Sequence, residues 1–124
     1  MSFTPYIQKA LLDWVLQGAT PARPGAAWVQ WATQSPNWSS AFDGPYSPRQ
    51  TVSFAAANSP TGSKTNLNAI TGRNTAAATA VGFNIYDSNV GGTRLAYGTL
   101  TASIAGSSGD QPAFAAGGLV VVLS

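Results

Sequence analysis

The residues that could perform acid–base or metal chemistry in this sequence are few and far apart. The 124-residue chain contains no histidine, no cysteine and no glutamate, so Asp13, Asp43, Asp87 and Asp110 are its side-chain acids. A paired-carboxylate hydrolase would need two of them to meet, and most transition-metal sites need histidine or cysteine. All but Asp13 stand in turn-like sequence, where aspartate commonly bonds local backbone. The sequence therefore predicts no catalytic residue, no metal site and no cofactor.

Aromatic residues give a stronger signal than the acids. Residues 28–46 contain Trp28, Trp31, Trp38, Phe42 and Tyr46. Exposed rings of this kind can stack on sugars, as in a carbohydrate-binding module, whereas buried rings fill a small core. Because side chains alternate along a strand, we expect one of Trp28 and Trp31 to be buried and the other exposed. Trp38 lies in turn-rich sequence and is the ring expected to face a partner.

Charge is scarce, which narrows the classes of partner. Charged residues make up 8% of the chain and the net charge is +2, against about 25% charged residues in ordinary proteins. Nucleic-acid binding needs clustered cations, and here the basic residues are scattered, at positions 9, 23, 49, 64, 73 and 94. No apolar run approaches the ~20 residues of a membrane helix, and no signal-peptide pattern opens the chain. We therefore expect neither a nucleic-acid nor a membrane partner.

Residues 4–18, TPYIQKALLDWVLQG, predict a helix. Thr4 suits the N-cap and Pro5 the first helical position, and Gly18 suits a left-handed helix end. The spacing of apolar residues predicts one apolar face that consists of Ile7, Leu11, Trp14 and Val15. Leu12 and Leu16 widen this face. So broad a face must pack against the rest of the chain or against a neighbouring subunit.

The remainder of the chain predicts a β domain. Residues 19–26 contain two prolines and are expected to form a linker between a docking helix at 1–18 and a β domain at 27–124, within one globular unit. Short strands are predicted at 27–33, 49–56, 64–70, 79–86, 94–104 and 118–123. Their spacing favours an antiparallel β-sandwich or an open barrel. The uncharged last strand is expected either in the centre of the sheet or buried against another subunit.

Four segments in order resemble a family of small tailed-bacteriophage tail fibre or minor virion proteins. They are LLDWVLQG in the helix, YSPRQTVSF, GFNIYDSNVGGTRLAYGTL and the closing AFAAGGLVVVLS. The resemblance spans nearly the whole chain. It implies a virion protein made in the host cytoplasm, and it brings no catalytic residues with it.

Residues and resemblance together predict a non-enzymatic structural protein of a tailed phage. It would associate with other virion proteins, in the tail or as a capsid decoration (cement) protein on the major capsid protein, and by analogy as a homo-oligomer such as a trimer. The expected contacts are the helix face, the aromatic loop 35–48 and the hairpin turn 87–93, with interface residues Ile7, Leu11, Trp14, Val15, Trp38, Phe42, Tyr46, Asp87 and Asn89. The alternative from another class is a carbohydrate-binding module for a host surface glycan.

Overall fold

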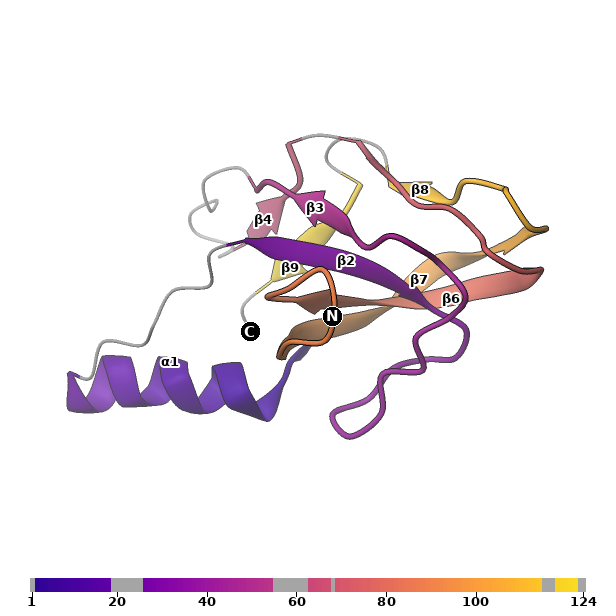
Figure 1. The fold of residues 1–124 in the computed structure, drawn as a ribbon. Helices are drawn as coiled ribbons and strands as arrows, with labels where there is room; N and C mark the ends of the chain where they lie inside the picture. The colour runs from indigo at the N-terminus through magenta and orange to yellow at the C-terminus, as the bar shows by residue number, and fades with distance from the viewer. Residues whose placement is uncertain (1, 19–25, 55–62, 68, 115–117, 123–124) are drawn as a thin grey trace.

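The fold is mainly β, with a helix near the N-terminus (Figure 1). The computed structural model describes residues 2–18, 26–54, 63–67, 69–114 and 118–122. In chain order the elements are β1 (Ser2–Phe3), α1 (Pro5–Gln17), β2 (Ala27–Ala32), β3 (Gln50–Val52), β4 (Ser63–Thr65), β5 (Ile70–Thr71), β6 (Ala78–Tyr86), β7 (Arg94–Gly106), β8 (Ala113–Phe114) and β9 (Val120–Val122).

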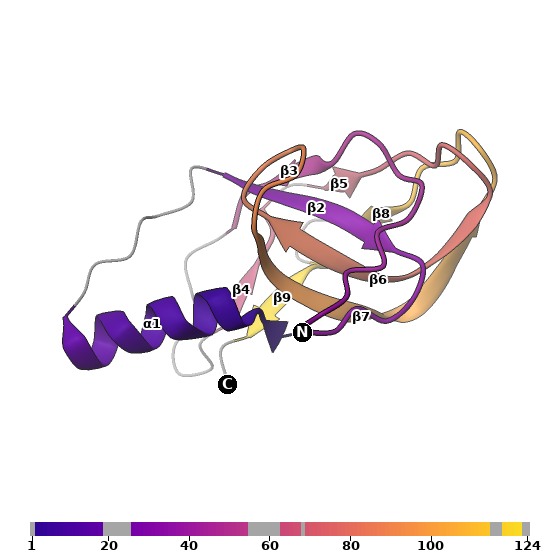
Figure 2. The same ribbon diagram turned by 60° about the horizontal axis from the view of Figure 1, so that its bottom comes forward.

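The strands form an open, sandwich-like arrangement of antiparallel sheets. The largest sheet has the order β1-β7-β6-β2-β3, and every neighbouring pair in it is antiparallel. Two small sheets, β4–β9 and β5–β8, complete the fold. Figures 1 and 2 show that the long strands β2, β6 and β7 form its centre. The predicted fold class is confirmed, and the sheets formed by the described strands do not close into a barrel.

Two strand predictions need correction. The strand predicted at 64–70 is two short strands, β4 and β5, which pair with different partners. Between them Asn66 is buried, and its Oδ1 accepts a hydrogen bond of 2.8 Å from the amide of Leu119. The last strand, β9, pairs with β4 rather than lying in the centre of the large sheet. The two-residue strands β1 and β8 were too short to predict.

Aromatic side chains fill the core between the sheets. Trp31 is fully buried and stacks on Phe114 with 5.7 Å between ring centroids. The ring centroids of Tyr46 and Trp31 are 6.1 Å apart, and the Phe83 and Phe114 rings meet edge to face with 5.7 Å between their centroids. On β2, Val29 and Trp31 join this core while Trp28 is half-buried. The expected difference between the two tryptophans is therefore seen, although Trp28 is not fully exposed.

The helix begins and ends for different reasons. At its C-terminus Gly18 is left-handed, with φ of 72°, and its amide donates to the carbonyl of Trp14 at 3.2 Å. At its N-terminus Thr4 is the N-cap residue and Pro5 begins the helix, as predicted, but the Thr4 hydroxyl makes no cap bond and instead donates to β7. The predicted linker at 19–26 falls outside the described residues except for Ala26. Among the described residues, no helix has the length and hydropathy to cross a membrane.

The contrast between two tryptophans tests this core. We expect Trp31→Ala to lower the free energy of unfolding by about 3–5 kcal/mol, because it removes a fully buried ring. Trp38→Ala should change it by less than about 0.5 kcal/mol, because that side chain is exposed. Urea denaturation followed by circular dichroism measures both values. Equal losses from the two variants would contradict the placement of Trp31.

Candidate interaction surfaces

The first turn of α1 is anchored to strand β7. The amide of Thr4 donates to the carbonyl of Leu95 at 3.0 Å, and its hydroxyl is within bonding distance of the carbonyls of Arg94, at 2.7 Å, and Leu95, at 3.1 Å. Just before it, Phe3 on β1 pairs with Ala96 on β7. Thr4 is buried, so the base of the helix is part of the folded body.

A β-bulge supplies this anchor. Ile85 pairs with Ala96, but the next residue, Tyr86, pairs with Arg94, so Leu95 is an extra residue in β7. Successive carbonyls of a regular strand point to opposite edges, whereas a bulge turns the backbone locally. The bulge therefore explains how the neighbouring carbonyls of Arg94 and Leu95 can both face Thr4.

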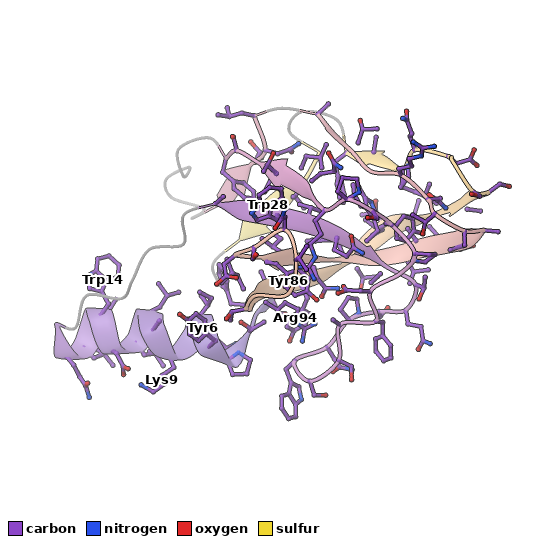
Figure 3. The ribbon with its side chains drawn as sticks, viewed as in Figure 1. Tyr6, Lys9, Trp14, Trp28, Tyr86 and Arg94 are labelled. Carbon is purple, nitrogen blue, oxygen red and sulfur yellow. The ribbon has the colours of Figure 1, made fainter. Side chains whose placement is uncertain are left out.

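Beyond its base, α1 is largely uncovered. No residue of the helix is buried, and Ile7 and Leu11 are half-buried. Apolar side chains occur around the outer half, where Trp14 stands at the end of the helix farthest from the sheets (Figure 3). A helix that is apolar on more than one side is normally buried. Five large side chains here are 53–75% exposed: Tyr6, Leu12, Trp14, Val15 and Leu16.

An apolar pocket lies where the helix base meets the sheet. Its volume is about 220 Å³. Ile7 contributes from α1 and Phe3 from β1, while Ile85 and Leu95 contribute from the hairpin strands. The apolar surface of the helix therefore continues onto the body of the protein.

The aromatic loop between β2 and β3 has a fixed tip. The Asn37 side-chain oxygen accepts hydrogen bonds from the amides of Ser39 and Ser40, at 2.9 and 2.8 Å. Pro36 is buried over Gly82, where a Cβ would lie 2.5 Å from the proline ring. Trp38 lies within this turn and is 69% exposed.

Arg94 fixes the same loop from the strand beneath it. Its guanidinium donates to the carbonyls of Asn37 at 2.5 Å and Ser40 at 3.2 Å, and to the side-chain oxygen of Asn84 at 2.9 Å. Asn84 is fully buried and donates in turn to the carbonyl of Ala41 at 2.9 Å. The arginine side chain and its own backbone carbonyl therefore hold two different segments, the loop and the helix base.

Asp43 is the acceptor at the centre of this network. One of its oxygens accepts from the side-chain amide of Asn84 at 2.8 Å, and the other accepts from the hydroxyl of Tyr86 at 2.6 Å. Burial of the ring, together with this hydrogen bond to a carboxylate, raises the pKa of Tyr86 far above its ordinary value. Arg49 lies 3.7 Å from the same carboxylate.

Arg49 joins the aromatic loop to the hairpin turn. Its guanidinium donates to the carbonyls of Ser88 at 3.0 Å and Gly91 at 2.7 Å, and it lies 3.7 Å from the centroid of the Tyr86 ring. Within the turn, the amide of Thr93 donates to the Asp87 carboxylate at 2.8 Å. The hairpin turn 87–93 and the aromatic loop, through Asp43, are thus bound to one cation. We call residues 35–43 of the predicted loop 35–48, together with residues 87–93, the distal surface.

The predicted interface residues fall into three groups. Ile7, Leu11, Trp14 and Val15 lie on α1, and Trp38, Phe42, Asp87 and Asn89 lie on the distal surface. The prediction that Tyr46 lies at an interface needs correction, because its side chain is 4% exposed and belongs to the core. Sequence reasoning missed Arg49, Asn84, Tyr86 and Arg94, since nothing in their spacing indicates that they meet.

The carboxylates do not form a chemical site in the described part of the chain. Asp13 pairs with Lys9, Asp43 with Arg49, and Asp87 and Asp110 accept amide hydrogen bonds within their own turns. Among the described residues, no three histidine, cysteine, aspartate or glutamate side chains lie close enough together to hold a metal ion. The carbohydrate-binding alternative needs several exposed rings on one face, and two of the five rings of residues 28–46, Trp31 and Tyr46, are buried.

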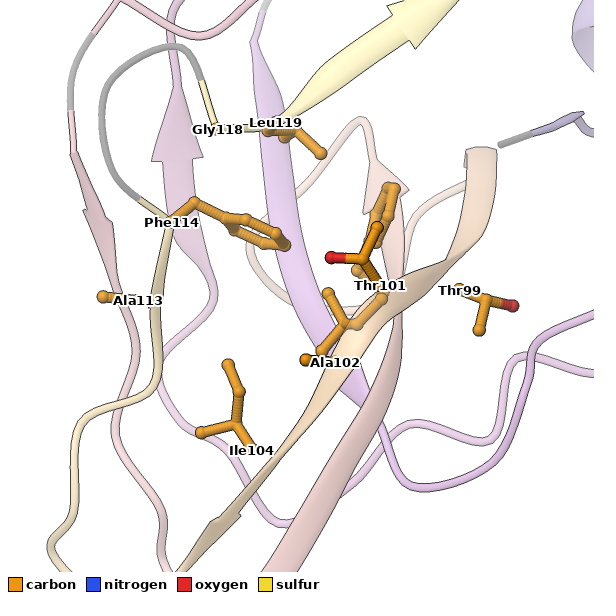
Figure 4. A pocket seen from close by; sticks show the side chains of 10 residues that line it. Thr99, Thr101, Ala102, Ile104, Ala113, Phe114, Gly118 and Leu119 are labelled. Atoms are coloured by element: carbon orange, nitrogen blue, oxygen red, sulfur yellow. The ribbon is translucent and has the colours of Figure 1, made fainter.

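A larger pocket opens between β7 and the segment that carries Phe114 and Leu119 (Figure 4). It has a volume of about 360 Å³. It lies where the register of β6 and β7 shifts between Ala80 and Gly82. Its described lining is apolar or threonine, and none of those side chains is titratable. The pocket can therefore accept apolar groups but offers no acid or base to a reaction.

An open β-sandwich with an uncovered apolar helix has the features of a subunit that contacts other proteins. The chain belongs to the family of podophage GP4 fiber I protein gp80, whose family model matches residues 2–122. This confirms the resemblance seen in the sequence. Family membership identifies a phage fibre structural protein and implies a virion component that associates with other virion proteins. No curated protein matches the chain.

The anchor of the helix can be tested at Thr4. We expect Thr4→Val to lower the free energy of unfolding by about 1 kcal/mol, because it removes the buried hydroxyl that bonds β7. Thr79→Val is the matched control, since Thr79 is exposed on β6. Urea denaturation measures the energies, and amide hydrogen exchange reports whether the first turn of α1 opens. Indistinguishable variants would argue against the anchor.

The Tyr86–Asp43 contact predicts a pH dependence at alkaline pH. The folded-state pKa of Tyr86 is raised, so the unfolded chain loses this proton first, near pH 10. Stability should therefore fall as pH rises above about 10. Tyr86→Phe should reduce the slope of stability against pH in this range. Part of the slope should remain, because burial also raises the pKa of Tyr46. Thermal melts from pH 8 to 11, with the exposed Tyr6→Phe as control, measure it. An unchanged slope in Tyr86→Phe would contradict the contact.

Proposed function

We propose that this protein is a non-enzymatic fibre subunit that docks on another tail protein through helix α1. The observation that carries the proposal is the helix itself, which has no buried residue but five large apolar side chains more than half exposed. Exposed apolar area of this kind marks a protein contact in a soluble chain. The partner is a protein surface with an apolar groove, because the helix presents the spacing that such grooves accept.

The charged residues of the helix pair with each other, which supports a protein partner. Lys9 and Asp13 are four residues apart and pair with each other, so α1 carries no unpaired charge at its surface. Burying a neutral helix avoids the cost of stripping water from unpaired ions. The same neutrality allows several copies to lie side by side without repulsion, which supports a homo-oligomer such as a trimer.

Family membership supports the tail over the capsid for this docking role. The family is named for a fiber protein, whereas a capsid decoration protein would be expected to carry a different name. The four aspartates are each engaged by neighbouring groups, and no described residue that lines the larger pocket is titratable; both observations support a role without catalysis. Residues 1–18 thus act as the docking element and 27–124 as the body in this proposal.

Paired variants of α1 test the docking. Leu12→Ser/Val15→Ser removes two exposed apolar side chains, and Gln8→Ser/Gln17→Ser removes two exposed polar ones from the same helix. We expect the first pair to reduce the copies of this protein per purified particle at least about tenfold, as loss of interface anchors costs more than 1 kcal/mol. Quantitative mass spectrometry of particles from a complemented phage measures this.

Folding must be separated from docking in this experiment. Both pairs replace exposed residues with serine, so each should change the free energy of unfolding of the isolated chain by a small amount. The Gln8/Gln17 pair also loses the exposed hydrogen bond from the Gln8 side chain to the carbonyl of Phe3. Normal incorporation of the Leu12/Val15 variant would refute docking through α1. A turnover activity of the purified protein, lost on changing one aspartate, would refute the non-enzymatic role.

A further inference from the structure

We infer that the distal surface, residues 35–43 and 87–93, is a second protein-binding surface, preformed by Arg49 and Arg94, with Trp38 as its anchor. Its occupant is an uncharged, apolar pocket on a neighbouring protein of the particle. This inference rests on the proposed function, because it takes the chain to be an assembled subunit. With α1 it would make the protein a connector that holds two partners.

The exposed side chains of the distal surface are apolar and come from both loops. Trp38 is 69% exposed and Phe42 38% exposed on the aromatic loop, and Val90 is 80% exposed on the hairpin turn. Tryptophan is enriched among the residues that dominate binding energy at protein interfaces. Arg49 bonds to the hairpin turn and pairs with Asp43, so these side chains are presented by one connected unit.

The network beneath the surface holds the loop in a conformation it would not adopt freely. Phe42 has a φ of 54°, which is unfavourable for a residue with a side chain. Its carbonyl accepts from the amide of Thr33 at 3.0 Å, and its neighbours Ala41 and Asp43 both accept from Asn84. A loop ordered in this way loses little entropy on binding, which strengthens the contact of a few exposed anchors.

Charge identifies the class of partner. Arg49 is paired with Asp43, and Arg94 directs its guanidinium to carbonyls inside the loop. The side-chain oxygen of Asn37 is occupied by Ser39 and Ser40. The two cations, Asp43 and the side-chain oxygen of Asn37 are thus already bonded within the chain. An apolar protein pocket needs none of them, so it fits this surface better than a glycan does.

Radical footprinting of intact particles tests this surface in the assembled state. We expect the hydroxyl-radical oxidation rate of Trp38 to fall about fivefold or more from the free chain to the particle, as its ring becomes enclosed. Trp14 should be protected as well if α1 is docked. Trp31 is the internal control, since it is fully buried in the free chain and should react slowly in both.

The outcomes separate the two proposals. Protection of Trp14 with an unchanged rate at Trp38 would overturn the second surface and leave docking through α1 intact. Protection of Trp38 without Trp14 would do the reverse. If Trp38 becomes protected in particles only after host envelope glycan is added, the surface binds carbohydrate and the inference is wrong.

A variant of Arg94 tests the preformed loop. Arg94→Met removes the bonds to Asn37, Ser40 and Asn84, and we expect it to bring the Trp38 rate in particles back toward that of the free chain. Protection of Trp14 should persist, because Thr4 bonds to the backbone of β7 rather than to this side chain. Arg73→Met is the matched control, since Arg73 is exposed. Full protection of Trp38 in the Arg94 variant would show that the network does not position it.

Discussion

The bulge at Leu95 in strand β7 is the constraint on which the rest of the arrangement depends. It lets the carbonyls of Arg94 and Leu95 accept from Thr4 at the base of α1, while the side chain of Arg94 reaches the aromatic loop. A shift of one residue in a strand moves every side chain to the opposite face. The register of β6 and β7 therefore sets the position of the helix and of the loop together, and neither can be placed without the other.

Most of the charged side chains that the structure describes are engaged by other groups of the chain rather than left unpaired. Asp43, Arg49 and Arg94 are engaged with loop carbonyls, with each other or with Asn84 and Tyr86, and the helix pair of Lys9 and Asp13 cancels. What faces outward is mainly neutral and partly apolar. Such a surface would suit a free protein poorly, but it lets an assembled one make repeated contacts without stripping water from ions. The low charge of the sequence thus suits a protein that functions in contact with other proteins.

Local patterns predicted local structure well, and contacts between distant residues poorly. The helix at 4–18 and the strands at 27–33, 79–86 and 94–104 follow from periodicity and from end signals such as Gly18. The strand at 64–70 failed because Asn66 bonds to Leu119, 53 residues away, which no local pattern reveals. Tyr46 looked like a loop residue, yet it belongs to the core through Trp31. Asp43 looked like an ordinary turn former, because Arg49, Asn84 and Tyr86 meet it only after the sheet has formed.

The two attachments made by Arg94 also determine how partners on α1 and on the distal surface would be placed relative to each other. The helix base and the aromatic loop are held by the backbone carbonyl and the guanidinium of one residue, Arg94, in a strand that pairs along much of its length with β6. Both attachments are made by β7, so a partner at the base of α1 and a partner on the distal surface would be positioned by the same strand.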